Sequence, residues 1–156
     1  MATAIWPIEG VAISTPVTGS LADYVNNLYK ANYTQGRCYP TLAAGKTVVS
    51  GINWTLSAAF AVLVPINTIH VPYHASAVVI ETCDTDGVYE LAVYYGAGNT
   101  LMATIRFSYL GGFFGNSIYL LPSVALAAEA QLDMKLAISG GVAGTITASV
   151  IYRILS

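Results

Sequence analysis

The sequence predicts an all-β protein, in which an antiparallel, jelly-roll-like β-sandwich of about eight strands follows an N-terminal arm. Apolar and polar residues alternate with a period of two over most of the chain beyond residue 75. Turns rich in Gly, Asn and Asp separate the alternating stretches at short intervals. Short strands in this succession favour a sandwich over β-α-β units, and 156 residues suit one such domain.

The arm is expected to span residues 1–45 and to contain one short helix, and the sandwich to span residues 46–156. Residues 1–19 include two prolines, which favour an extended segment. The helix is predicted because apolar side chains follow the spacing of one helix face behind Ser20, a suitable N-cap. These side chains are Leu21, Tyr24, Val25 and Leu28.

The strands of the sandwich are predicted from the alternation and from the turns that bound it. We expect strands at 75–83, 88–95, 100–109, 117–121, 131–138 and 145–155, with a loop at 123–130. Less regular alternation predicts further strands at 47–49, 53–64 and 67–71. The side chains assigned to the core face are Tyr89, Leu91, Val93, Tyr95, Leu101, Ala103, Ile105, Phe107, Tyr109, Leu132, Met134, Leu136, Ile138, Ile146, Ala148, Val150, Tyr152 and Ile154.

The low charge of the chain predicts an assembly rather than a free monomer. Lys and Arg number 6 and Asp and Glu 8, so charged residues make up 9% of the chain, against about 25% in an average globular protein. Hydrophobic residues reach 55%. Burying surface between subunits would keep such a chain soluble, and we expect a closed homotrimer. The net charge of −2 excludes the basic surface that nucleic acid requires.

Two long uncharged windows, residues 47–80 and 107–128, exceed the roughly 20 residues of a membrane helix. Gly, Asn and Pro interrupt both windows, so we read them as strands and expect no membrane partner. The cysteines Cys38 and Cys83 allow one disulfide or two thiols, of which we favour the thiols.

Residues that could carry chemistry form no convincing catalytic or metal site. His70 and His74 with Cys83 lack the closed ligand set of a zinc site, and Pro72 excludes a helix between them. The stretch 84–87 starts like a calcium loop but lacks the remaining ligands, so a hairpin turn is the simpler interpretation. The carboxylates Glu81, Glu90, Glu129 and Asp133 form no recognisable pair, and Glu90 and Asp133 are assigned to a solvated outer face. We therefore expect no enzymatic activity and no cofactor.

Tyrosine is the most informative residue type for binding, because it combines a large apolar ring with a hydroxyl group. The chain has 11 tyrosines, which suit subunit interfaces, and less favourably sugar-stacking surfaces. The expected interface residues are Tyr94, Tyr95, Tyr109, Tyr119, Arg106 and Arg153. For the two arginines a solvated outer face is an equal alternative to an ion pair with Glu90 or Glu81.

Several short motifs between residues 71 and 155 carry a resemblance to a known group. They are Gly87-Val88-Tyr89-Glu90-Leu91 leading to Tyr94-Tyr95-Gly96, Ile105-Arg106-Phe107, Gln131-Leu132-Asp133-Met134-Lys135-Leu136, and Gly144-Thr145-Ile146-Thr147-Ala148 into Ile151-Tyr152. This part of the chain resembles the small single-jelly-roll virion proteins of tailed bacteriophages, which include capsid decoration proteins and fibre-head domains. The connection at 122–130 departs from that group, and residues 1–50 match none of its motifs.

The resemblance implies a non-enzymatic protein of the virion, usually a trimer, which decorates a capsid or forms part of an appendage. Its partners would be other copies of itself and other virion proteins. We expect residues 1–19 to attach the protein, with Ile5, Trp6, Pro7 and Ile8 as contact residues. The alternative is a receptor-binding head that stacks host glycans on exposed tyrosines or tryptophans.

Overall fold

The computed structural model describes Leu21, residues 36–41 and residues 43–155. The chain divides into two compact units, of which the second runs from Gly36 to Leu155. The expected attachment residues and all of the predicted helix except Leu21 lie outside the described residues. No helix in the described part of the chain is both long and apolar enough to cross a membrane.

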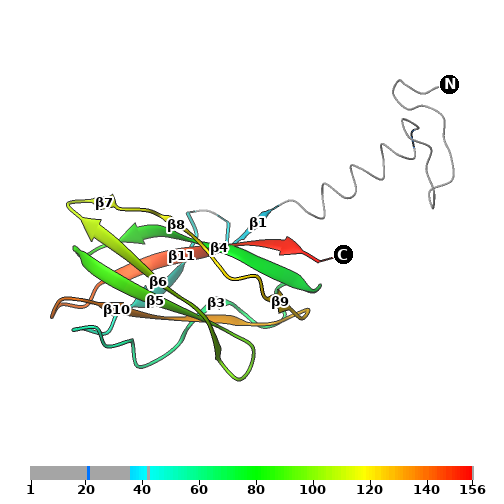
Figure 1. Cartoon of the computed structure of the whole chain (residues 1–156), viewed down its shortest axis with the longest axis horizontal. Helices are drawn as coiled ribbons and strands as arrows, with labels where there is room; N and C mark the ends of the chain where they lie inside the picture. Colours follow the sequence, from blue (N-terminus) through cyan, green and yellow to red (C-terminus); the bar gives the residue numbers. More distant parts are fainter. Residues whose placement is uncertain (1–20, 22–35, 42, 156) are drawn as a thin grey trace. The chain divides into compact units, whose positions relative to one another are not determined.

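The second unit consists of two antiparallel sheets (Figure 1). One sheet has the order β2 (Lys46–Val49), β11 (Thr145–Ile154), β4 (Tyr73–Cys83) and β8 (Ile118–Leu120). The other has the order β3 (Ala61–Val64), β10 (Leu132–Ile138), β5 (Gly87–Tyr95) and β6 (Thr100–Leu110). Three short strands extend them, β1 (Arg37–Tyr39) beside β11, β7 (Phe113–Phe114) beside β6 and β9 (Ala125–Leu126) beside β4.

The connections between these eight main strands give the winding of a jelly roll. Each connection crosses from one sheet to the other, except the hairpin that joins β5 to β6 within one sheet. The first main strand, β2, consequently lies beside the last, β11, and β3 lies beside β10. The predicted all-β, jelly-roll-like sandwich is confirmed.

The predicted core face is confirmed along most of its length. The core side chains of β5, β10 and β11 are almost fully buried: Tyr89, Leu91, Val93, Leu132, Met134, Leu136, Ile138, Ile146, Ala148 and Val150. The Tyr89 ring stacks on Phe107 with 5.1 Å between ring centroids. Each large apolar side chain buried in this way contributes about 1.5–3 kcal/mol, so the alternation read from the sequence accounts for the stability of the sandwich.

One core assignment is wrong because a β-bulge shifts the register. Between β5 and β6 the pairing slips after Val93, which opposes Ala103, so that Tyr94 opposes Leu101. The extra residue, Met102, turns into the core, and Leu101 is left 53% exposed. A one-residue slip moves side chains to the opposite face, which is the change seen here.

Of the strands expected before residue 72, the one at 53–64 is present only at its end, as β3, and the one at 67–71 is absent. The stretch 53–60 is a turn and loop, because Asn53 and Trp54 adopt positive φ angles of 52° and 62°. The stretch 67–71 forms turns, where Asn67 has a φ of 63°. The short strand β1 pairs with β11 and belongs to the same compact unit as the sandwich.

Candidate functional site: the open edge of the sandwich

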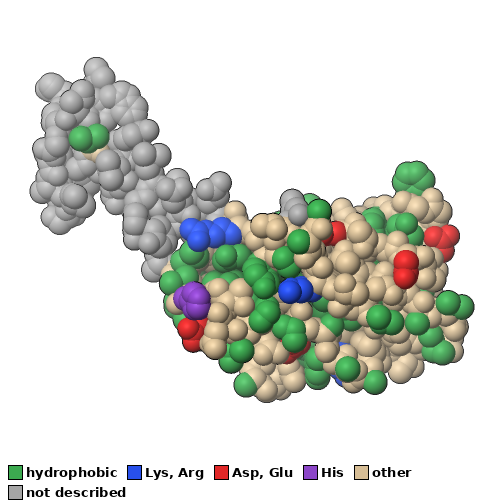
Figure 2. Space-filling model, turned by 180° about the vertical axis from the view of Figure 1, so that it is seen from behind, with side chains coloured by type: hydrophobic (Ala, Val, Ile, Leu, Met, Phe, Trp, Pro, Cys, Tyr) green, Lys and Arg blue, Asp and Glu red, His purple; other side chains and the backbone are tan. Residues whose placement is uncertain are grey.

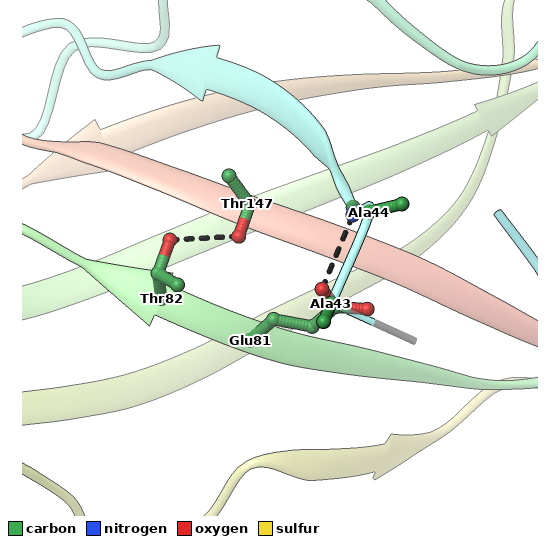
Figure 3. A pocket seen from close by; sticks show the side chains of 6 residues that line it. Ala43, Ala44, Glu81, Thr82 and Thr147 are labelled. Atoms are coloured by element: carbon green, nitrogen blue, oxygen red, sulfur yellow. Dashed lines mark hydrogen bonds between the residues drawn. The ribbon is translucent and has the colours of Figure 1, made fainter. Parts of the chain in front are cut away.

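The hollow beside Glu81 is the first candidate for chemistry (Figure 3). Its volume is about 530 Å³, and it is lined by Ala43, Ala44, Gly45, Glu81, Thr82 and Thr147. The Gly45 amide donates to one oxygen of the Glu81 carboxylate at 3.1 Å, and the buried Ser149 hydroxyl donates to the other. Thr82 and Thr147 bond to each other at 2.7 Å. Glu81 therefore fastens the segment before β2 to the sheet, and each of its two oxygens accepts a hydrogen bond there.

The two cysteines carry free thiols, as expected. The Cys38 thiol donates to the Pro40 carbonyl at 3.2 Å. Burial, and then the negative charge of Glu81, raises the pKa of Cys38 above its ordinary value. A raised pKa keeps the thiol protonated, which is the opposite of what a nucleophilic cysteine needs.

The histidines do not converge on a shared site. The His70 Nδ1 atom lies 3.3 Å from Glu129, and the His74 Nε2 atom lies 2.9 Å from the Ser123 hydroxyl. Within residues 36–41 and 43–155 no three potential ligands group around a metal position. Each histidine instead helps hold the segment that leads into β10.

The stretch 84–87 forms a turn whose carboxylates bind backbone groups. The Thr145 amide and the Thr85 hydroxyl donate to Asp84 Oδ1 at 2.7 and 2.8 Å. These hydrogen bonds, that from Thr145 foremost, lower the pKa of Asp84. Gly111 donates its amide to both oxygens of Asp86. The carboxylates therefore join the β4–β5 turn to its neighbours.

The expectation of a solvated carboxylate is wrong for Asp133, although its side chain is on the predicted face. Asp133 is only 3% exposed and lies between Val62 of β3 and Tyr94 of β5. The Gln131 side-chain amide donates to both carboxylate oxygens at 2.7 and 2.8 Å. This pair satisfies a charge that would otherwise be costly to bury.

The expected interface tyrosines occupy two separate places. Tyr94 lies on the outer face of β5 with its ring edge-on to Phe60 at 5.0 Å, whereas Tyr95 packs against the core. Tyr109 packs against Phe114 at 4.9 Å, and Tyr119 lies 6.1 Å from the Phe107 ring. The described tyrosines are all buried or half-buried, so none of their rings is fully open to solvent.

The two expected interface arginines differ in their contacts. Arg106 Nε donates to Glu90 Oε2 at 2.8 Å, which is one of the two ion pairs proposed for it. The Arg106 guanidinium also lies 5.1 Å from the centre of the Trp54 ring. Arg153 is exposed opposite His74 on β4, and the described residues offer it no ion pair.

A group of exposed apolar side chains lies along the edge of the sandwich formed by β6, β7 and β8, which we call the open edge. Its members are Leu110, Phe113, Ile118 and Leu120, of which Phe113 is 79% and Leu120 is 85% exposed. Residues 100–128 contain one charged side chain, that of Arg106. These four residues lie in the second uncharged window of the sequence and are not among the predicted interface residues.

Beyond its short pairing with β7, the backbone of β6 has no partner strand among the described residues along this edge. The Gly115 amide donates to the Ser108 carbonyl at 3.0 Å, so the backbone groups of Ser108 point away from β5. Because backbone groups alternate along an antiparallel strand, those of Arg106 and Thr104 point the same way. No described strand pairs with β6 at these two residues on that side. The open edge therefore presents free N–H and C=O groups next to apolar side chains.

The opposite side of the sandwich is protected differently. Arg37 in β1 and Lys46 in β2 place positive charges on that edge, and Lys135 donates to the Ala58 carbonyl at 3.1 Å beside it. Charged side chains on edge strands discourage pairing with another chain. Figure 2 shows one face of the molecule, on which isolated charged side chains are separated by wide apolar and uncharged areas. On the open edge, β7 and β8 have no charged side chain and β6 has only Arg106.

No protein-family model matches the sequence, and no curated protein matches it either. Solved structures of infectious bursal disease virus show a remote likeness. The Gt strain particle matches 77% of this chain and 32% of the viral chain at 17% identity and a TM-score of 0.36. The VP2 subviral particle matches 80% and 31% at 12% identity and a TM-score of 0.34. This chain thus spans about a third of the viral chains it resembles.

Proposed function

We propose that the protein is a non-enzymatic structural component of a virion and that it assembles as a homotrimer through the open edge. The observation that carries the proposal is the edge itself, on which apolar side chains and unpaired backbone groups lie within residues 100–120 with one charge among them. Proteins rarely leave such an edge exposed, because it binds other strands without selection. The composition of the chain favours another subunit as the partner that buries this edge.

Burial of the open edge would stabilise an assembly appreciably. Each large apolar side chain that leaves water contributes about 1.5–3 kcal/mol, and Phe113 and Leu120 have most of their surface to lose. In a closed ring of subunits every such edge is buried, whereas a head-to-tail contact that does not close would produce filaments. We therefore propose a closed trimer.

The placement in a virion rests on the kind of fold and the kind of surface. Jelly rolls of this winding are common in viral capsids and also in lectins. A fold alone does not assign a function, but a jelly roll that has few charges and one unprotected edge suits a shell or appendage built of repeated contacts. We propose that it decorates or reinforces a phage capsid, with residues 1–19 as the attachment segment.

Substitutions at the open edge test the assembly. Leu120→Asp and Phe113→Asp place a charge on the edge without touching the core, and Val142→Asp places one on a side chain that is 70% exposed in the β10–β11 turn. We expect wild type and Val142→Asp to sediment as trimers and the edge variants as folded monomers with an unchanged far-ultraviolet spectrum. A monomeric wild type, or trimers in all four cases, would overturn the proposal.

Deletion of residues 1–19 separates attachment from assembly. The shortened protein is expected to remain a trimer and to lose binding to capsids that lack the native protein. A shortened protein that still binds such capsids would remove the role proposed for the segment.

The alternative, a head that binds glycans, finds little support in the tyrosines, because the described ones are buried or half-buried. The exposed aromatic ring that such a function needs is present elsewhere, at Trp54.

A further inference from the structure

The turn of residues 52–55 holds a tryptophan in a conformation that bulky residues rarely adopt. Trp54 has a φ of 62° and follows Asn53 at 52°, and the Thr55 amide closes the turn on the Ile52 carbonyl at 2.9 Å. Asn tolerates the left-handed region, but for a large side chain it is a strained conformation. The sequence thus places its largest side chain where glycine or asparagine would fit better.

Backbone hydrogen bonds to the end of β10 hold this turn in place. The Trp54 amide donates to the Ile138 carbonyl at 2.8 Å, and the Asn53 amide donates to the Gly140 carbonyl at 2.9 Å. A further hydrogen bond runs from the Ile138 amide to the Gly51 carbonyl at 3.0 Å. Strain that the surroundings enforce in this way is typical of functional positions.

The strained turn presents the indole ring to solvent. Trp54 remains 46% exposed, and the Arg106 guanidinium lies 5.1 Å from its ring centre. Arg106 is also paired with Glu90, so a donor group and a carboxylate lie together beside the ring. Beneath them the outer face of the sheet is formed by the small side chains Ala92 and Ala137, both buried. The indole and the ion pair thus form a shallow platform.

A second aromatic group continues the platform along β10. The Lys135 Nζ atom lies 4.4 Å from the centre of the Phe60 ring, and Phe60 in turn contacts Tyr94. Lys135 opposes Ala92, and Arg106 opposes Glu90, so the two cations lie on the same face of the sheet on either side of β5. This face therefore carries two partly exposed aromatic rings, Trp54 and Phe60, each in contact with a cation.

The charges on the platform select the class of ligand. Arg106 is neutralised by Glu90, and the Lys135 ammonium group is engaged with the Ala58 carbonyl and the Phe60 ring. An anionic ligand would gain little there, and a large apolar partner would leave the ion pair without water. A pyranose ring fits both features, because its C–H face packs on an indole and its hydroxyl groups bond to guanidinium and carboxylate.

We propose that the Trp54 platform binds a neutral oligosaccharide. The binding is separate from assembly at the open edge, and its failure would leave the proposed function standing. The strained backbone of Trp54 lowers the stability of the fold, and its indole ring provides the stacking surface for the sugar.

Titration of the protein with neutral trisaccharides tests the proposal directly. The background variant Trp6→Phe leaves Trp54 as the sole tryptophan. Cellotriose, maltotriose and chitotriose are added to millimolar concentration, and the indole fluorescence and the indole N–H resonance are recorded. At least one sugar is expected to shift both signals in a saturable way. No saturable shift with any of the three sugars would overturn the proposal.

Two substitutions separate binding from packing. Trp54→Gly and Trp54→Asn suit the positive φ, so we expect both to retain or raise the thermal midpoint and to lose the sugar affinity at least tenfold, as measured by calorimetry. Ile66→Ala, which shortens another exposed side chain, is expected to leave the affinity unchanged. A lowered midpoint with unchanged affinity, or loss of the trimer in both variants, would show a structural or subunit-contact role and overturn the proposal.

Discussion

Close contacts restrict which residues fit the turns at one end of the sandwich, and Gly144 is an example. A Cβ atom on Gly144 would overlap the hydroxyl of Tyr89, which donates its proton to the Thr85 carbonyl. Burial of that phenol, the largest cause, raises its pKa well above the ordinary value. We expect Gly144→Ala to lower the free energy of unfolding by about 1–3 kcal/mol, as measured by urea titration.

Gly98 provides the matched control for this change. A Cβ atom there would meet nothing within 4 Å, and its backbone is outside the left-handed region. Gly98→Ala is expected to leave the stability unchanged or slightly raised. Equal effects at the two glycines would mean that the Tyr89 contact does not restrict residue 144.

Asp84 gives the stability of the fold a defined dependence on pH. Its pKa is lowered in the folded state, so the carboxylate contributes stability above its unfolded pKa of about 3.9 and loses that contribution as the pH falls through the folded pKa. Asp84→Asn removes the charge but keeps an oxygen that can accept from Thr145. We expect the urea midpoint of the variant to fall less than that of wild type between about pH 5 and pH 3. Parallel curves would contradict this assignment.

At the scale of one strand, the two sides of β6 should respond differently to proline. The backbone N–H of Thr104 points to the open edge, whereas that of Ala103, one residue away, points to β5. Ala103→Pro is expected to lose about 3 kcal/mol of stability. Thr104→Pro is expected to cost less than about 1 kcal/mol in the folded monomer, because edge strands tolerate proline. Denaturation of the two variants in the Leu120→Asp background measures both.

The relative size of the two losses of stability shows which side of β6 is hydrogen-bonded to β5. A larger loss for Thr104→Pro than for Ala103→Pro would place the bonded side of β6 at the open edge and contradict the unpaired backbone described there.

The sequence predicted the long strands well, because residues such as Leu91 and Leu136 follow a local alternation that the fold uses directly. It failed where the cause is not local. The outward turn of Leu101 depends on a register slip between two strands, and the turn at Trp54 depends on hydrogen bonds from residues about 85 positions away, at Ile138 and Gly140. The short strands β7 and β9 exist only beside β6 and β4.

On the scale of the whole molecule, the candidate site could also be predicted only in part, because it depends on contacts between distant parts of the chain. The low charge of the chain predicted an assembly, and the window 107–128 contained the residues of the open edge. Which edge of the sandwich has few charges depends on strand order, since β6 with the short β7, and β8, lie on one side and Arg37 and Lys46 lie on the other. Tyr109 and Tyr119, two of the predicted interface tyrosines, pack partly buried against the core beside this edge.

Amide hydrogen exchange at several protein concentrations tests the central claim most directly. Assembly through the open edge predicts that amides of residues 104–120 with no partner inside the subunit, Arg106 and Thr104 among them, exchange slowly at high concentration and quickly on dilution below the dissociation range. Amides of β1 and β2 should exchange at the same rate throughout. Exchange of the open edge that is fast at every concentration, or protection that develops at β1 and β2 instead, would contradict the account.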